Sequence, residues 1–293
     1  TISGAAIAAI SPKQQNTLLP ASHSIDSREK LEERAAHGDA SAQFNLGTRY
    51  AEGNELPQDF SKAATWFKKA AEQGMGRAQF NLSVLYELGK GVPQNGVEAL
   101  KWLRLSAEQG VSIAQFNLGV RYDVGEGLER DYAQALKWFL LAAEQGYAAA
   151  QFNLGFMYAE GAGIAQDYGA AEAWYRKAAE QGHAAAQFNL GLMYAQGTGV
   201  AQDLAAAAAW YRLAADQGNV DAQYDLGLMY AQGVGVAQDY AAAAAWYRRA
   251  AEQGSAEAQY DLAYLYRKGI GVAQDYAAAR SEEHTSELQS RQC

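Results

Sequence analysis

The sequence predicts an all-α solenoid, in which pairs of antiparallel helices repeat along the chain and pack on one another. Three residue types recur at a constant step of 36 residues, which is the signature of a tandem-repeat fold. Tryptophans keep this step from Trp66 to Trp246, and glycines keep it from Gly38 to Gly254. A constant step without insertions indicates repeats that stack identically. The glutamines of the string Ala-Gln-Phe/Tyr-Asn/Asp-Leu are Gln43, Gln79, Gln115, Gln151, Gln187, Gln223 and Gln259.

Each repeat is predicted to hold two helices, helix A and helix B. In the first repeat, helix A runs from about Ala42 to Glu52, with apolar residues at helical spacing. A loop of the form Gly-x-Gly-Val-x-Gln-Asp follows in most copies, and its first glycine ends helix A. Helix B then continues to about Gln73, where Gly74 ends it. Because one hairpin cannot bury its own apolar faces, the neighbouring repeats must cover them.

The last residue of each loop is placed to cap helix B. Its side-chain oxygen can accept a hydrogen bond from the backbone N–H groups of the first turn. We interpret the Gly-x-Gly of these loops as turn geometry, because a dinucleotide-binding motif requires a preceding strand. Aromatic residues at the Trp66 and Tyr50 positions are interpreted as core. The predicted capping residues are Asp59, Asn95, Asp131, Asp167, Asp203, Asp239 and Asp275.

The N-terminal part of the chain does not follow the repeat. We interpret residues 1–25 as a flexible segment, either the remnant of a signal peptide or a linker. Residues 26–38 are predicted to form an N-terminal capping helix, because Asp26 and Glu29 form a capping-box pattern. Lys30 takes the tryptophan position of the register, which suits a helix with one face in water.

The repeat resembles a known family. The pattern Ala-x-Ala-Gln-Phe-Asn-Leu-Gly-x-Met-Tyr, followed by Trp-Tyr-x-x-Ala-Ala-Glu-Gln-Gly, is similar to the Sel-one-like repeat, a relative of the tetratricopeptide repeat. A tetratricopeptide array has a period of about 34 residues, which the constant step excludes. The resemblance implies a right-handed superhelix that acts as a scaffold or adaptor, in a family widespread in bacteria. It covers residues 39–279, as repeats 39–74, 75–110, 111–146, 147–182, 183–218, 219–254 and, in part, 255–279.

Residues 280–293 do not continue the seventh repeat. The register places a tryptophan at position 282, where the sequence has Glu282. The string Arg-Ser-Glu-Glu-His-Thr-Ser-Glu-Leu-Gln-Ser, which starts at Arg280, resembles the one-frame translation of a common short-read sequencing adapter. We therefore expect residues 280–293 to be an adapter-derived tail that is disordered or frayed, and not a terminal cap.

Composition argues against several classes of function. The formal net charge is −9 with acids and bases interspersed, so the chain lacks the basic stripe that binds nucleic acid. No apolar run approaches the roughly 20 residues of a transmembrane helix. Cys293 is the only cysteine and the four histidines lie in unrelated contexts, which argues against a disulfide or a metal site. We expect no cofactor and no enzymatic activity, and leave open oligomeric state and a periplasmic, secreted or cytoplasmic location.

One stripe of helix A differs between repeats while the packing positions hardly change. By analogy with related arrays, helix A is expected to line a concave groove. Asparagine can bind a peptide backbone as both donor and acceptor, and methionine suits adaptable contacts. We therefore hypothesise that a protein or peptide partner binds this stripe. Its residues are Asn45, Arg49, Asn81, Asn117, Arg121, Asn153, Met157, Asn189, Met193, Asp225 and Met229.

Three alternatives stay in view. In the first, the asparagines only satisfy backbone groups between repeats and bind no partner. In the second, the chain is a structural or regulatory component of the cell envelope. The third is a β-lactam-binding enzyme, as in a cysteine-rich subgroup of Sel-one-like proteins, and it loses support because the paired cysteines of that subgroup are absent.

Overall fold

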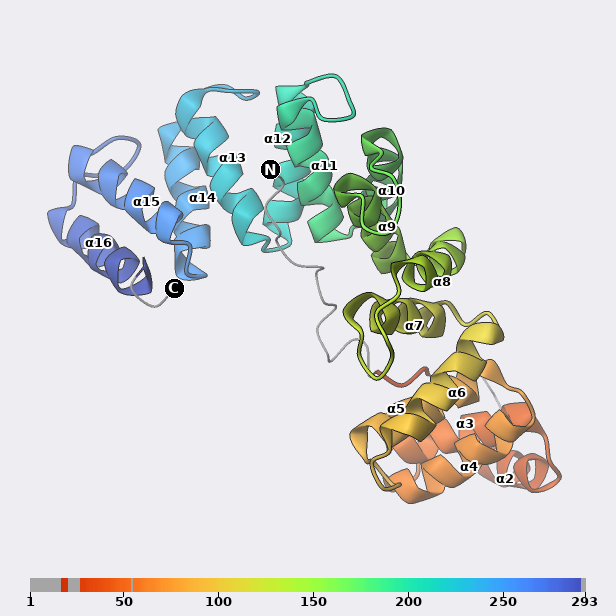
Figure 1. Cartoon of the computed structure of the whole chain (residues 1–293). Coiled ribbons are helices and arrows are strands. Elements are labelled where there is room, and N and C mark those ends of the chain that lie inside the picture. Colours follow the sequence, from red (N-terminus) through yellow and green to blue (C-terminus); the bar gives the residue numbers. More distant parts are fainter. Residues whose placement is uncertain (1–16, 21–26, 54, 291–293) are drawn as a thin grey trace. The chain divides into compact units, whose positions relative to one another are not determined.

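The computed structural model describes residues 17–20, 27–53 and 55–290, and within these ranges the regular structure is helical without strands (Figure 1). The protein is an all-α repeat solenoid, as predicted. Helices α3 to α15 with odd numbers are the A helices, and α4 to α16 with even numbers are the B helices. Their bounds are α2 (Arg28–Ala36), α3 (Ala40–Glu52), α4 (Phe60–Glu72), α5 (Gly76–Leu88), α6 (Gly96–Glu108), α7 (Ser112–Val124), α8 (Tyr132–Glu144), α9 (Ala148–Glu160), α10 (Tyr168–Glu180), α11 (Ala184–Gln196), α12 (Leu204–Asp216), α13 (Val220–Gln232), α14 (Tyr240–Glu252), α15 (Ala256–Lys268) and α16 (Tyr276–Ser290).

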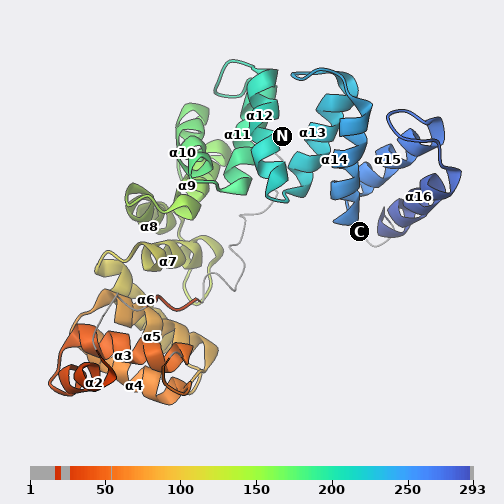
Figure 2. The ribbon, with the colours of Figure 1, turned by 180° about the vertical axis from the view of Figure 1, so that it is seen from behind.

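The chain divides into two compact units, and the division falls within α9. The first unit contains residues up to 154 together with 162–164, and the second contains 155–161 and the residues from 165 onward. In the first unit, each helix from α2 to α7 packs against the next one in sequence, so that the series ends with the α7–α8 pair. In the second unit the same holds from α10 to α16. Figure 2 shows these successive helix pairs from behind. Packing between sequence neighbours is what a solenoid requires.

A glycine on helix A lets a large ring of helix B pack against its backbone. A Cβ atom added to Gly119 would lie 2.7 Å from Cδ1 of Phe139, so no larger residue fits without movement. In the second repeat this pair is replaced by Ser83 and Leu103, in which the helix-B side chain is smaller. The matching pairs in other repeats are Gly47–Phe67, Gly155–Tyr175, Gly191–Tyr211 and Gly227–Tyr247.

A buried glutamine on helix A joins each repeat to the helix before it. Nε2 of Gln115 donates a hydrogen bond of 3.2 Å to the carbonyl oxygen of Ala107, in the last turn of α6. Its Oε1 accepts a bond of 2.7 Å from Nε2 of Gln145 at the end of α8. The glutamine therefore satisfies a helix-end carbonyl that would otherwise lack a partner. The same bond to the residue eight positions earlier forms at Gln43, Gln79, Gln151, Gln187, Gln223 and Gln259.

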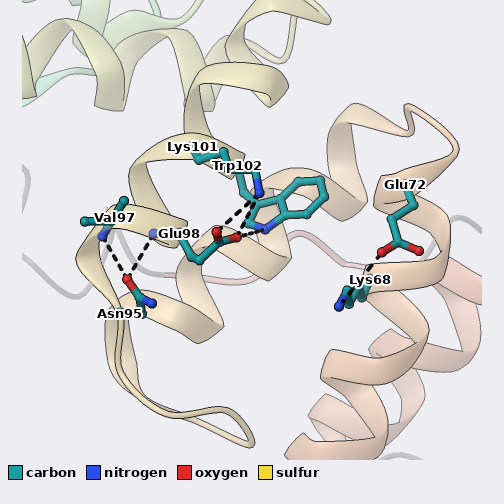
Figure 3. A network of polar contacts seen from close by, with 7 residues as sticks. All are labelled: Lys68, Glu72, Asn95, Val97, Glu98, Lys101 and Trp102. Atoms are coloured by element: carbon teal, nitrogen blue, oxygen red, sulfur yellow. Dashed lines mark hydrogen bonds and ion pairs between the residues drawn. The ribbon is translucent and has the colours of Figure 1, made fainter.

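The predicted caps of helix B are confirmed. Figure 3 shows one of them: Oδ1 of Asn95 accepts bonds of 3.1 Å from the backbone N–H groups of Val97 and Glu98. In the same helix, Oε2 of Glu98 accepts a bond of 3.1 Å from Nε1 of Trp102. Aspartates cap the other B helices through the same oxygen, namely Asp59, Asp131, Asp167, Asp203, Asp239 and Asp275.

The interpretation of the tryptophans as core residues is only partly correct. Trp102 and Trp138 are buried, whereas the other four are half-buried on the flank of helix B. Cationic side chains cover exposed ring faces, with Nζ of Lys177 4.0 Å from the ring centroid of Trp174. The attraction between a cation and a ring face stabilises a half-buried tryptophan at this position. The consistently buried large side chain is the next residue along, as at Phe67.

Both ends of the repeat array carry a helix. Helix α2 lies within the predicted capping segment, and buries Leu31 and Ala35. Its N-cap residue Ser27 makes no side-chain capping bond, while the expected cap Asp26 lies outside the described residues. At the other end, α16 continues through Ser290 instead of fraying at position 280. Glu, Leu, Gln and Arg are good helix formers, and α16 packs against α15, which accounts for the difference. The adapter-like origin of this stretch stays a prediction.

The glycine–ring contact can be tested by transferring the residue pair of the second repeat, Ser83 and Leu103, to the matching positions 119 and 139 of the third repeat. Gly119→Ser should lower the free energy of unfolding by about 1–3 kcal/mol, because the added side chain overlaps the Phe139 ring. Adding Phe139→Leu recreates the Ser83–Leu103 pair and should make the double variant more stable than the sum of the single effects. Urea unfolding of the four proteins measures this coupling. Strict additivity would contradict it.

Candidate partner-binding surface

One polar position of helix A recurs in every repeat, and its members together are named the amide ladder. In the first unit the ladder side chains lie among apolar neighbours: Asn81 is 0 % exposed and Asn153 is 4 % exposed. A carboxamide removed from water must find donors and acceptors within the protein or in a ligand. The ladder consists of Asn45, Asn81, Asn117, Asn153, Asn189, Asp225 and Asp261.

A segment of the chain itself, Thr17–Pro20, lies on the ladder in the first unit. The backbone N–H of Leu19 donates a bond of 2.7 Å to Oδ1 of Asn81, and Nδ2 of Asn81 donates a bond of 3.0 Å to the carbonyl oxygen of Leu19. Nη2 of Arg77 donates a bond of 2.7 Å to the carbonyl oxygen of Pro20. Figure 1 shows the segment as a short red stretch apart from α2, alongside the α5–α7 region.

The two leucines of this segment pack into the solenoid core. Leu18 and Leu19 contact the cluster that contains Phe44 and Leu82, and also the cluster that contains Phe80. These apolar residues belong to A helices of neighbouring repeats, and the second cluster also includes Leu103 and Leu118. Sequence analysis missed the segment. A pair of leucines before a proline, within a stretch of small and polar residues, is the signal that could have identified it.

The methionines of the predicted stripe are core residues. Met157, Met193 and Met229 are all buried, so their interpretation as adaptable surface contacts is corrected by the structure. Met229 packs in the core cluster with Ala208 and Tyr211 of the preceding helix B. The position four residues after the ladder borders the core: an apolar side chain there, as at Met229, packs against the preceding helix B, whereas Arg49 and Arg121 at the same position reach carboxylates.

The predicted arginines are engaged in ion pairs. Nη2 of Arg121 lies 2.6 Å from Oε2 of Glu87, which links α7 to α5, and both side chains are largely shielded from solvent. Nη1 of Arg49 lies 2.6 Å from Oε2 of Glu55 in the loop after α3. The Arg121–Glu87 pair borders a cavity of about 190 Å³ that Asn117 also lines. Both arginines are therefore paired with carboxylates of this chain, and Arg121 lies beside the ladder residue Asn117.

Helix B gives the ladder a different chemistry in the two units. In the first unit, the core column of helix B has no hydroxyl group at Phe67, Leu103 and Phe139. In the second unit the same column is tyrosine: the buried Tyr175 hydroxyl lies near Asn189, and the Tyr211 hydroxyl hydrogen-bonds to Asp225. Asp261 accepts a bond of 3.2 Å from the hydroxyl of Tyr224 on helix A. The second unit thus supplies hydroxyl partners to its ladder aspartates, through Tyr211 and Tyr224.

Asn153 is the clearest open position of the ladder. Its Nδ2 atom is buried and has no hydrogen-bond partner in the part of the chain that the structure describes. A buried donor without an acceptor costs about 1–3 kcal/mol. A backbone carbonyl from a bound segment would satisfy it, as that of Leu19 satisfies Asn81.

The aspartates of the second unit are electrostatically strained. Burial, together with the negative charge of Asp221, raises the pKa of Asp225 from its ordinary 3.8 to about 6, and the hydrogen bond from Tyr211 opposes this. Burial likewise raises the pKa of Asp261. A carboxyl group stands here where the first five repeats have a neutral carboxamide.

The family of the chain follows from its repeats. A family model, the Sel1 repeat, matches residues 40–75, 76–111, 112–147, 148–183, 184–219, 220–255 and 256–281. The chain belongs to the Sel1 repeat family, whose members commonly serve as protein-interaction scaffolds and generally are not enzymes. None of the described helices combines the length and apolar character needed to cross a membrane.

Solved structures of relatives share this fold. A protective antigen of uropathogenic Escherichia coli strains, described as displaying an SLR fold, is 41 % identical with a TM-score of 0.86, over 90 % of this chain and 56 % of that chain. A Sel1 repeat protein from Oxalobacter formigenes is 35 % identical with a TM-score of 0.72, over 92 % of this chain and 82 % of that chain. The chain therefore spans little more than half the length of the first of these structures.

A curated relative matches over a shorter stretch. The secretory immunoglobulin A-binding protein EsiB of Escherichia coli is 45 % identical over 42 residues, which are 14 % of this chain and 9 % of that protein. This stretch is little longer than one repeat, so it supports the family and leaves the activity of the whole relative aside.

We expect Asp225→Asn to stabilise the protein in a pH-dependent way. Because the folded-state pKa is raised, the contribution of Asp225 to stability is fully present below about pH 4 and is lost as the pH rises through about 6. The variant should match the parent near pH 4 and exceed its free energy of unfolding by about 1–3 kcal/mol at pH 7.5. Urea unfolding across this range measures the difference, and a constant offset between the two proteins would refute the assignment.

Proposed function

We propose that the chain is a protein-interaction scaffold that holds an extended segment of a partner protein on the amide ladder of its first unit. The observation that carries this proposal is the pair of hydrogen bonds between the Asn81 carboxamide and the backbone of Leu19. One side chain satisfies both the N–H and the C=O group of a single residue. Because these bonds involve only the backbone of the bound segment, they depend on its conformation more than on the identity of any one of its side chains.

The geometry favours an extended partner over a helical one. In a helix, the backbone N–H and C=O groups are already used within the helix itself, so a carboxamide has nothing to bind. In an extended segment both groups of a residue are free for an external partner. Asn117 and Asn153 repeat this chemistry in the next two repeats, and Asn153 has a buried donor that lacks an acceptor among the described residues. The net charge of −9 further favours protein over nucleic acid as the partner.

A ladder variant tests the proposal. Asn81→Ala, Asn117→Ala and Asn153→Ala combined should weaken binding of extended segments at least about tenfold, because each lost backbone bond is worth roughly 1 kcal/mol. The measurement pans a displayed library of random twelve-residue peptides against the whole chain, then determines the dissociation constants of the selected peptides by fluorescence anisotropy.

The matched control is Asn189→Ala, which changes the ladder in the second unit, where the neighbouring residue of helix B is Tyr175. We expect this variant to keep the parental affinity. If the triple variant bound as tightly as the parent and was only less stable, the ladder would serve the fold alone and the proposal would fail.

A second candidate activity is binding of secretory immunoglobulin A. It is favoured by the 45 % identity to EsiB over 42 residues. Surface plasmon resonance with the purified immunoglobulin on an immobilised chain tests it directly. Loss of the signal in the triple ladder variant would place that interaction on the same surface.

A further inference from the structure

We infer that residues 17–20 are a built-in ligand of the first unit, and that the partner segment that displaces them carries two adjacent apolar residues before a proline. This inference rests on the proposed function and adds the identity of the occupant and the side-chain chemistry of its competitor. The same four residues contribute the backbone bonds to Asn81, the bond to Arg77 and the two packed leucines.

The sequence of the segment prepares it for this site. A residue that precedes proline is sterically biased toward extended conformations, which applies to Leu19. In that conformation its N–H and C=O groups are free for the two bonds with Asn81. Pro20 has no N–H group and cannot continue a helix, so its carbonyl remains free to accept the bond from Arg77.

The leucines supply selectivity that the backbone bonds lack. Leu18 and Leu19 are only partly buried, yet they contact core clusters built from several repeats, with Phe44 and Phe80 among their neighbours. A charged side chain at either position would lose its hydration without gaining a partner. The site therefore favours an apolar pair, which distinguishes Leu-Leu-Pro from a generic extended peptide.

The second unit cannot offer an equivalent site. Its ladder residues Asn189 and Asp225 lie beside tyrosine hydroxyls of helix B, and Asp225 hydrogen-bonds to the Tyr211 hydroxyl. A peptide there would have to displace the bond between Tyr211 and Asp225 and would meet a tyrosine ring in place of phenylalanine or leucine. The built-in ligand therefore lies on the unit whose B helices have Phe67, Leu103 and Phe139 in that column.

A partner segment can compete with residues 17–20 for their site on the first unit. A segment tethered through a short linker meets its site at an effective concentration in the millimolar range. A free partner with the same intrinsic affinity must approach that concentration to displace it, so the displacing segment has to bind the empty site more tightly than residues 17–20 do. The tethered segment therefore sets a minimum affinity for displacement, and weak, non-specific peptides do not reach it.

The test uses a variant, named the released chain, in which residues 17–20 no longer bind their site while the sequence of the solenoid is unaltered. Full-length chain with Leu18→Asp and Leu19→Asp is titrated against a fluorescein-labelled peptide of residues 13–24, and the dissociation constant is compared with that of the unaltered chain. We expect the released chain to bind at least about tenfold more tightly, because the tethered competitor is gone. The same peptide with both leucines changed to aspartate should not bind.

Two further variants in the released chain locate the site. Asn81→Asp should weaken the peptide at least about tenfold, since a carboxylate cannot donate to the Leu19 carbonyl. Asn189→Ala should leave the affinity unchanged. Because the altered peptide leaves the protein intact, it keeps the test valid even if an Asn81 variant folds poorly.

The outcomes separate this inference from the proposed function. Equal affinity of the released and unaltered chains for the residue 13–24 peptide, while library peptides still depend on Asn81, overturns the built-in ligand and leaves the scaffold proposal standing. If neither kind of peptide binds the released chain, both proposals fail.

Discussion

Every feature of this solenoid depends on one constraint: a repeat can bury its apolar faces only against its neighbours. The buried glutamine makes that contact specific, because a residue such as Gln115 must meet both a helix-end carbonyl and the amide of Gln145. Shifting one repeat against the next would break both bonds at once and leave buried polar atoms unpaired. This explains why the 36-residue step holds without an insertion, and why the glycine of helix A stays opposite a ring of helix B.

The same constraint places polar groups where they serve a partner. Helix A needs apolar residues on its packing side, so the ladder, two residues after the glutamine, borders the core while keeping one edge open. Asn81 uses that edge for Leu19. The ladder residues can therefore stabilise the fold or bind a segment, and the residue in the core column of helix B determines which of these roles each one has. Phenylalanine at 67 leaves the carboxamide to an extended segment, whereas tyrosine at 211 engages the ladder internally.

Sequence periodicity predicted the helices, their caps and the family because these depend on local residues. Asp59 caps its helix through atoms three residues away, so spacing alone is enough. Rotation about the helix axis was harder. The stripe from Asn45 was treated as one surface, but the step of four residues to Met157 from Asn153 turns into the core. The segment at Leu19 could not be placed at all, because its contact with Asn81 spans 62 residues and has no periodic signature.

Along the ladder, a tyrosine hydroxyl appears on helix B before the carboxamide is replaced by a carboxylate. Tyr175 already faces Asn189, so a hydroxyl precedes the first acid in the array. An aspartate placed there without that donor would be a buried charge with nothing to stabilise it. At Asp225 the donor is present, yet the pKa is still raised to about 6, so the hydroxyl compensates only part of the cost. The second unit therefore accepts strain at positions that the first unit keeps neutral and able to bind. A ladder that must bind both the N–H and the C=O of a backbone at neutral pH is better served by a carboxamide than by a carboxylate, since the carboxamide both donates and accepts while the ionised carboxylate only accepts.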